Sequence, residues 1–227
     1  MIDFKNIAAT SQLYNFHSHT QFCDGHAEMP EFAAKAAEMG FSHYGFSPHS
    51  PVPIESPCNM KTDDVAEYLG IFNRLKQEYA GQVELLVSME IDYLGDYWGP
   101  SNEYFSKLPL DYRIGSVHFI PSGDTMVDTD GHFDSFKTKM ALFFDNDIRY
   151  VVETFYDQTL KMIAAGGFDI IGHFDKIGQN ASYFSPGIED EPWYAKRVEE
   201  VMEAIKDAGI IAEINTKSMF QHHRLFP

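Results

Sequence analysis

The chain has 227 residues, which is enough for one substantial hydrophobic core. Its formal net charge of -17 argues against a nucleic-acid partner, because proteins that bind nucleic acids usually carry a basic face. Two cysteines without CxxC spacing argue against a disulfide framework or a zinc knuckle, and no stretch has the length of a membrane-spanning or secretion segment. We therefore expect a cytoplasmic globular protein.

Short apolar or aromatic runs alternate with segments of helical periodicity, which is typical of repeated β-α units around a parallel sheet. Strands are expected near residues 13–17, 42–47, 84–91, 112–118, 168–173 and 210–215. Proline, glycine and capping residues mark the ends of the helices. Helices are expected at residues 28–39, 62–79, 133–165 with a break near 145–147, and 192–208. Loops rich in proline, serine and glycine are expected at residues 47–57, 95–101 and 121–131.

No repeat or interdomain linker is evident, so we expect a single domain over residues 1–227. The sequence QHHRLFP follows the last expected strand directly, without a helix to cover that sheet edge. We therefore expect the domain to be incomplete at its C-terminal end.

Two histidines stand where the first expected strand gives way to a loop. His17 and His19 point to the same side of the strand because side chains alternate, so both imidazoles can reach one ion. The following loop carries Asp24 and His26 back towards them. Imidazole nitrogen is a preferred ligand of zinc and also suits iron or manganese. Taken alone, His-x-His is a weak signal, and two incidental exposed histidines explain it equally well.

The recurrence of such side chains strengthens the metal interpretation. Polar side chains stand at or just past the ends of the next four expected strands, and these are His49, Glu90, His118 and His173. The carboxyl ends of parallel strands are where active sites of α/β proteins assemble, so a shared metal site is predicted there. The competing interpretations are buried structural histidines and, for Glu90, an ion-pair partner. The other histidines are expected to be surface or structural residues: His43, His132, His222 and His223.

The histidines, Asp24 and Glu90, with their order and spacing along the chain, resemble the motifs of the polymerase and histidinol phosphatase (PHP) superfamily, specifically its histidinol-phosphate phosphatase branch. The resemblance spans residues 14–215, and the Gly-Ser-Val-His-Phe segment points most narrowly to that branch. It rests on His17-x-His19, Asp24-Gly25-His26, Pro48-His49, Glu90-Ile91-Asp92-Tyr93, Gly115-Ser116-Val117-His118 and Gly172-His173-Phe174-Asp175. It implies an α/β fold, a distorted TIM-like (β/α)7 barrel whose last strand is missing from this chain.

The resemblance also implies two to three divalent ions, Zn, Fe or Mn, at the mouth of the barrel. The implied ligand sets are His17, His19 and Glu90 for the first ion, Glu90, His118 and His173 for the second, and His26 and His49 for the third. The family pattern closes with an Asp-x-His pair, and this sequence ends before one. We therefore expect the first and third ions to lack a ligand each in this chain, which puts its activity in doubt.

The implied activity is a phosphoric monoester hydrolase that converts L-histidinol phosphate and water to L-histidinol and phosphate in histidine biosynthesis. Catalysis would depend on Glu90 and His118, because ions bridged by the carboxylate lower the pKa of a shared water. Lys176, Lys217 and Arg224 are candidates for binding the phosphate, and a solvated surface role is an equal alternative for each.

Asp24 and Asp92 could orient the imidazoles as hydrogen-bond acceptors or meet a cationic substrate. The expected partner is a small phosphorylated metabolite, without nucleic acid or membrane, and no oligomeric state is indicated. Three alternatives remain open. They are a PHP phosphoesterase acting on nucleotides or other phosphate esters, a metal-dependent hydrolase of the amidohydrolase kind, and an inactive, truncated metal-binding barrel.

Overall fold

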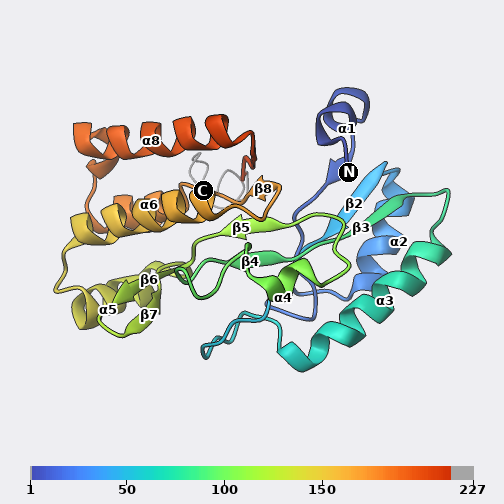
Figure 1. Ribbon diagram of the computed structural model, residues 1–227, viewed down its shortest axis with the longest axis horizontal. Helices are drawn as coiled ribbons and strands as arrows, with labels where there is room; N and C mark the ends of the chain where they lie inside the picture. The colour runs from blue at the N-terminus through green and yellow to red at the C-terminus, as the bar shows by residue number, and fades with distance from the viewer. Residues whose placement is uncertain (1, 216–227) are drawn as a thin grey trace. The chain divides into compact units, whose positions relative to one another are not determined.

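A computed structural model describes residues 2–215 of the chain (Figure 1). The chain divides into two compact units, of which unit 1 comprises Met1–Ile91 and Tyr104–Ile114 and unit 2 comprises Asp92–Glu103 and Gly115–Pro227. The prediction of a single domain over residues 1–227 stays a prediction. None of the helices in the described part of the chain combines the length and apolar character that crossing a bilayer requires.

Unit 1 is built on a parallel sheet with strand order β1-β2-β3. Tyr14 pairs with His43, and His43 in turn pairs with Glu84, so the three strands are in register. Helices α2 and α3 pack against β2 and β3 (Figure 1). The elements are α1 (Phe4–Thr10), β1 (Tyr14–Asn15), α2 (Met29–Met39), β2 (His43–Phe46), η1 (Thr62–Asp64), α3 (Val65–Glu78), β3 (Glu84–Val87) and α4 (Glu103–Ser106), which begins at the unit boundary.

Helix α2 begins and ends where the sequence predicts. Glu28 and Glu31 form a capping box, Pro30 occupies the first turn, and Gly40 follows the helix in the left-handed conformation with φ 77°. The box satisfies two backbone N–H groups that have no partner within the helix, and glycine adopts positive φ without a Cβ penalty. These local interactions explain why the bounds could be predicted to within one residue.

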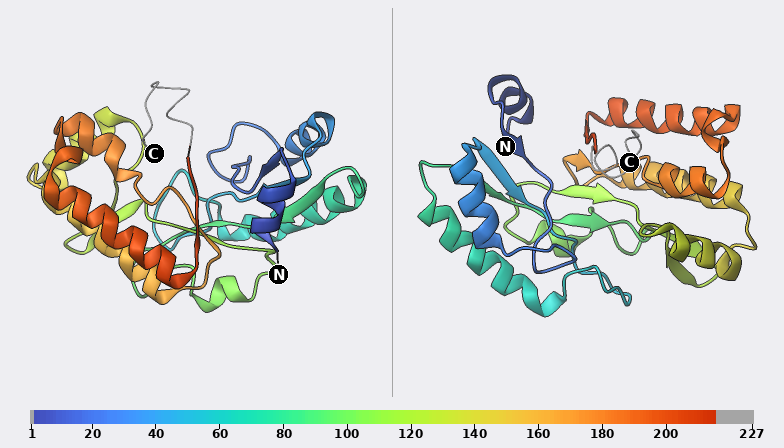
Figure 2. Two further views of the ribbon diagram at one scale, coloured as in Figure 1. Left: turned by 90° about the horizontal axis from the view of Figure 1, so that it is seen from above. Right: turned by 180° about the vertical axis from the view of Figure 1, so that it is seen from behind.

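Unit 2 consists of the remaining strands and a layer of helices. One sheet has strand order β4-β5-β8-β9, with the unit boundaries falling within β4 and β5, and β6 pairs with β7 as an antiparallel hairpin. Helices α6 and α8 lie side by side (Figures 1 and 2). The elements are β4 (Glu90–Asp92), β5 (Ile114–Ser116), β6 (Phe119–Ser122), β7 (Thr125–Asp128), α5 (Phe133–Phe143), α6 (Ile148–Ala165), β8 (Ile170–Ile171), α7 (Ile177–Phe184), η2 (Ile188–Asp190), α8 (Pro192–Ala208) and β9 (Ile211–Ala212).

The hydrophobic core of unit 2 lies between α6, α8 and the strands. Val152 and Phe155 of α6, Ile171 of β8 and Val201 of α8 are buried in one cluster. The long apolar helix face and the short β-branched strand meet there because each has one side that is unfavourable in water. This core fixes the ends of β5 and β8, from which two of the predicted metal ligands extend.

The α/β fold is confirmed, but several details differ from the sequence prediction. The expected strand 84–91 is two strands, β3 and β4, which belong to different sheets. The prediction of a loop at residues 121–131 is wrong for the residues that belong to the end of β6 and to β7. These two strands are joined by a turn at Gly123, which has φ 56°. The predicted helix break is confirmed, because Asp145 and Asn146 have positive φ. In the described residues the strands form three separate sheets and no closed barrel, so the (β/α)7 arrangement stays a prediction.

Tyr68 of α3 ties the helix to the ends of β2 and β3. Its buried hydroxyl lies 3.0 Å from the carbonyl oxygen of Phe46 and 2.7 Å from that of Ser88. We expect Tyr68→Phe to lower the free energy of unfolding by about 1–2 kcal/mol, because buried carbonyls lose their donor. Urea denaturation measures this, and Tyr79→Phe, at the partly exposed end of the same helix, is the control. Equal stability of the two variants would contradict the expectation.

Candidate metal centre

The backbone that carries His17 and His19 is fixed to the neighbouring strand. The N–H of Ser18 donates to Oγ of Ser47 at 2.9 Å, and the N–H of Ser47 donates to the carbonyl of Ser18 at 2.9 Å. A side chain at Gly45 would clash first with the hydroxyl of Tyr112 and would also lie 3.2 Å from Cα of Phe16, so glycine leaves room for these neighbours. His17 and His19 therefore stand at defined positions just beyond β1, as the alternation of the strand predicts.

Glu90 is fully buried at the start of β4. Its backbone pairs with the segment that follows β2, because the N–H of Glu90 donates to Pro48 at 3.0 Å and the N–H of Ser50 donates to Glu90 at 2.8 Å. The pairing brings His49 beside the carboxylate. Two residues that are 41 positions apart in the sequence thus reach the same point through parallel pairing (90 - 49 = 41).

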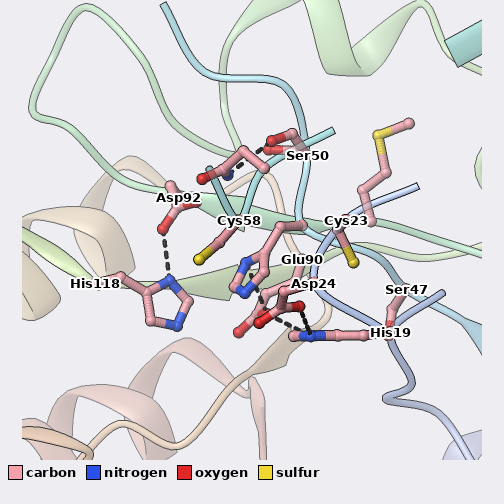
Figure 3. A network of polar contacts seen from close by, with 12 residues as sticks. His19, Cys23, Asp24, Ser47, Ser50, Cys58, Glu90, Asp92 and His118 are labelled. Carbon is pink, nitrogen blue, oxygen red and sulfur yellow. Dashed lines mark hydrogen bonds and ion pairs between the residues drawn. The ribbon is translucent and has the colours of Figure 1, made fainter. Parts of the chain in front are cut away.

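Three imidazoles converge on one oxygen atom of Glu90. Oε2 lies 3.2 Å from Nε2 of His17, 3.0 Å from Nε2 of His19 and 3.1 Å from Nδ1 of His49. Figure 3 shows His19 and Glu90 in this arrangement, with dashed lines for the contacts. All four of these side chains belong to unit 1. A buried carboxylate with three imidazole nitrogens around one oxygen is an arrangement that a cation stabilises.

The spacing of these atoms fits a bound metal ion. Zinc binds imidazole nitrogen and carboxylate oxygen at about 2.0–2.2 Å, so ligand atoms at a tetrahedral angle lie roughly 3.3–3.6 Å apart. The separations of 3.0–3.2 Å around Oε2 need only a small adjustment to reach that geometry. The potential ligand atoms of His17, His19 and Glu90 form one group, and those of His19, Asp24 and His49 form a second. The His/Glu/Asp cluster therefore fits binding of a divalent metal.

Asp24 contacts the nitrogen of the His19 ring that does not face Glu90. Nδ1 of His19 lies 2.7 Å from Oδ1 of Asp24, and Nε2 faces Glu90 (Figure 3). Burial opposes a charge on this ring, but the hydrogen bonds to Asp24 and Glu90 outweigh burial and raise the pKa of His19 to about 9. A carboxylate on Nδ1 fixes the ring orientation and directs Nε2 at a metal, which is how proteins commonly hold a histidine ligand.

In unit 2, His118 and His173 form a second pair of imidazoles. Nε2 of His118 lies 3.4 Å from Nε2 of His173, and both rings are buried. Nδ1 of His118 lies 2.6 Å from Oδ1 of Asp92, a contact drawn as a dashed line in Figure 3. The carboxylate of Asp92 fixes the His118 ring and leaves Nε2 for a ligand. The predicted role of Asp24 and Asp92 as acceptors for imidazole is supported by these contacts.

The remaining candidates lie in different settings. His26 is exposed and belongs to neither ligand group of unit 1, whereas the resemblance pairs it with His49. His43 is partly buried at the start of β2 with its ring beside Ser42, and exposed His132 precedes α5. These two positions agree with structural or surface roles. Lys217, Arg224, His222 and His223 lie outside the described residues.

Lys176 is the one phosphate-binding candidate that the described chain includes. Its side chain is mostly buried, and Nζ lies 3.3 Å from Oδ1 of Asp130. Asp130 was not predicted from the sequence, and neither was Glu213, whose Oε2 accepts a hydrogen bond from the backbone N–H of His173 at 3.3 Å. Asp130 lies in a stretch expected to be a plain loop. Nothing in its sequence neighbourhood links it to Lys176, which is 46 positions away (176 - 130 = 46).

We expect Asp92→Asn to weaken metal binding and turnover by about 10- to 100-fold, the usual effect of removing a carboxylate behind a histidine ligand. The amide can donate to Nδ1 of His118, which would move the ring proton to Nε2 and block its lone pair. Metal titration and steady-state kinetics measure the two quantities. The control is Asp96→Asn, an exposed carboxylate four positions away that accepts from Tyr93 at 3.1 Å. Unchanged metal affinity in Asp92→Asn would rule out this role.

The chain is an α/β protein whose cluster of imidazoles and carboxylates fits binding of a divalent metal. The PHP domain family matches residues 15–217, and the chain belongs to this family. It is 27% identical over 213 residues to a Deinococcus radiodurans protein named "Probable histidinol-phosphatase", covering 90% of this chain and 73% of that protein.

Two solved structures share the fold. A candidate histidinol phosphatase from Listeria monocytogenes superposes with a TM-score of 0.81 at 19% identity, over 91% of this chain and 84% of that one. Histidinol phosphate phosphatase from Lactococcus lactis, complexed with zinc, L-histidinol and phosphate, superposes with a TM-score of 0.53 at 18% identity, over 88% of this chain and 84% of that one.

Proposed function

We propose that this protein is a metal-dependent phosphatase that hydrolyses L-histidinol phosphate to L-histidinol and inorganic phosphate. The observation that carries the proposal is the convergence of His17, His19 and His49 on one oxygen of buried Glu90. The chain belongs to the PHP domain family, and a relative that covers 90% of it carries the name of a histidinol-phosphatase. The Lactococcus lactis neighbour was solved with zinc, L-histidinol and phosphate, which supports the same ligand chemistry.

The donor atoms suit zinc, iron or manganese, since imidazole and carboxylate serve all three metals. Such ions, when bound, lower the pKa of a water and neutralise charge on the phosphoryl oxygens. Within the proposal, two to three ions are held by these seven side chains: His17, His19, His26, His49, Glu90, His118 and His173. The distorted (β/α)7 barrel belongs to the same proposal.

The protein's own side chains supply orientation. The carboxylate of Glu90 places a negative charge among the imidazoles of unit 1, where it offsets the charge of bound cations. Asp24 and Asp92 fix the rings of His19 and His118, so that their Nε2 atoms need no reorganisation when a ligand binds. In unit 2, Lys176 supplies a positive group that can bind the phosphate.

A substrate panel tests the proposed function. The metal-loaded protein would be assayed for phosphate release from L-histidinol phosphate, from nucleoside monophosphates and from sugar phosphates, with an oligonucleotide exonuclease assay alongside. We expect L-histidinol phosphate to have the highest kcat/KM. A higher kcat/KM for a nucleotide or another ester would show that this ester, and not L-histidinol phosphate, is the preferred substrate. Metal binding without turnover of any ester would contradict the proposal and favour an inactive metal-binding protein.

A further inference from the structure

The loop that follows β7 is fixed from two sides. The N–H and Oγ1 of Thr129 donate to the carbonyl of His118 at 2.8 and 3.1 Å, so the loop is tied to the strand end that carries this imidazole. From α7, the side-chain amide of Asn180 lies 3.2 Å from the carbonyl of Thr129 and 3.3 Å from that of Gly131. Asn180 is buried, so these bonds are shielded from water. They hold the backbone on both sides of Asp130.

Asp130 directs its carboxylate at Lys176. Oδ1 lies 3.3 Å from Nζ of Lys176 and accepts the N–H of Gly131 at 2.6 Å. Lys176 follows His173 by three positions, and its N–H donates to the carbonyl of His173 at 2.8 Å. Burial opposes the charge on Asp130, but Lys176, His118 and His173 outweigh burial and lower the pKa of the carboxyl group to about 2. The contact between Asp130 and Lys176 therefore joins the loop bonded to the His118 carbonyl to the segment bonded to the His173 carbonyl, within unit 2.

Two features distinguish this ion pair from ordinary surface pairs. Lys176 exposes only 18% of its side chain, whereas Lys35, which pairs with Glu38 on the surface of α2, exposes 60%. The other partner is held by backbone and side-chain bonds on both flanks, whereas an exposed pair such as Arg149 and Glu153 lies along the surface of a single helix. An ordered ammonium group that follows His173 by three positions is suited to binding a phosphoryl oxygen.

We propose that Asp130 is a positioning residue, which holds the ammonium group of Lys176, three positions after His173, as a binding group for the substrate's phosphate. The inference rests on the proposed function and deepens it. Asp130 itself does not touch the phosphate, because its carboxylate would repel it. Its effect is to restrict a long side chain that would otherwise sample many rotamers.

The sign of the effect separates positioning from simple charge compensation. Replacing the carboxylate by a neutral amide makes the net charge of the site more positive by one unit. A purely electrostatic role therefore predicts that phosphate binds more tightly to Asp130→Asn. Positioning predicts the opposite, since the freed ammonium leaves its binding orientation. The two roles thus give opposite shifts in the same measurement.

The test compares the wild type with Asp130→Asn, Asp130→Glu, Lys176→Met and the double variant Asp130→Asn/Lys176→Met. For each metal-loaded protein we would measure kcat and KM for L-histidinol phosphate, the calorimetric Kd of inorganic phosphate, the metal content and the thermal midpoint. Glu153→Gln, which removes the carboxylate of an exposed ion pair in α6, is the matched control.

We expect Asp130→Asn to raise both KM and the phosphate Kd about tenfold, with kcat and metal content nearly unchanged, and Asp130→Glu to recover part of the loss. The double variant should be no weaker than Lys176→Met alone, because the two residues act through one ammonium group. Tighter or unchanged phosphate binding by Asp130→Asn, or additive losses in the double variant, would overturn the inference. Lack of turnover by the wild type would instead count against the proposed function, and the phosphate Kd would still test Asp130.

Discussion

Glu90→Gln is expected to lower metal-dependent phosphatase turnover by at least about 10³-fold, comparable to the loss of a major electrostatic group in an active site. Glutamine has nearly the same shape, so the buried position can still be filled. The amide is neutral, however, and its oxygen cannot offset the charge of cations among His17, His19 and His49. Metal content by mass spectrometry should fall together with turnover.

The matched control for this variant is Glu84→Gln. Glu84 is the exposed first residue of β3 and pairs only loosely with Lys76 at 3.7 Å. It should keep wild-type turnover and metal content. Circular dichroism and the thermal midpoint establish that both variants are folded. Full turnover by a folded Glu90→Gln variant would show that the carboxylate of Glu90 is not needed for catalysis.

Removal of the metal is expected to abolish turnover and to lower stability. The imidazoles around Glu90 lose the cation that holds them together, and a ligand present at 100 times its Kd contributes about 2.7 kcal/mol to the free energy of unfolding. Dialysis against a chelator followed by differential scanning calorimetry measures the loss. Stepwise addition of zinc, manganese or iron(II) should then restore both the thermal midpoint and the phosphate release.

The control for chelation is the His17→Ala/His19→Ala variant, which lacks two of the imidazoles. Its thermal midpoint should respond much less to the chelator than that of the wild type. A thermal midpoint of the wild type that is the same with and without chelator, with undiminished turnover, would show that no metal is needed.

The parts of the fold that the sequence predicts are those with local causes. Helix α2 ends at Gly40 because glycine adopts the left-handed conformation there. The chain turns between α5 and α6 because Asp145 and Asn146 have positive φ. The split of the expected strand 84–91 could not be predicted, because Ser88 alone is no strand-ending signal and only pairing with different neighbours separates β3 from β4. The β6–β7 hairpin was missed since its turn residues resemble those of an ordinary loop.

The candidate site divides in the same way. His17, His19 and Glu90 could be predicted because a polar residue at the end of an apolar strand is visible in the sequence. Their convergence on one oxygen atom follows from strand pairing, which links Glu90 to the segment of His49 and is not encoded locally. Asp130 could not be predicted, because its contact with Lys176 joins a loop to a distant helix start.

The most direct test of the metal centre is a crystal structure of the zinc-loaded protein with anomalous diffraction data at the zinc edge. We predict a zinc peak within about 2.0–2.2 Å of an imidazole nitrogen of His17, an imidazole nitrogen of His19 and a carboxylate oxygen of Glu90. A fully zinc-loaded crystal with no peak within bonding distance of Glu90 would contradict this metal centre.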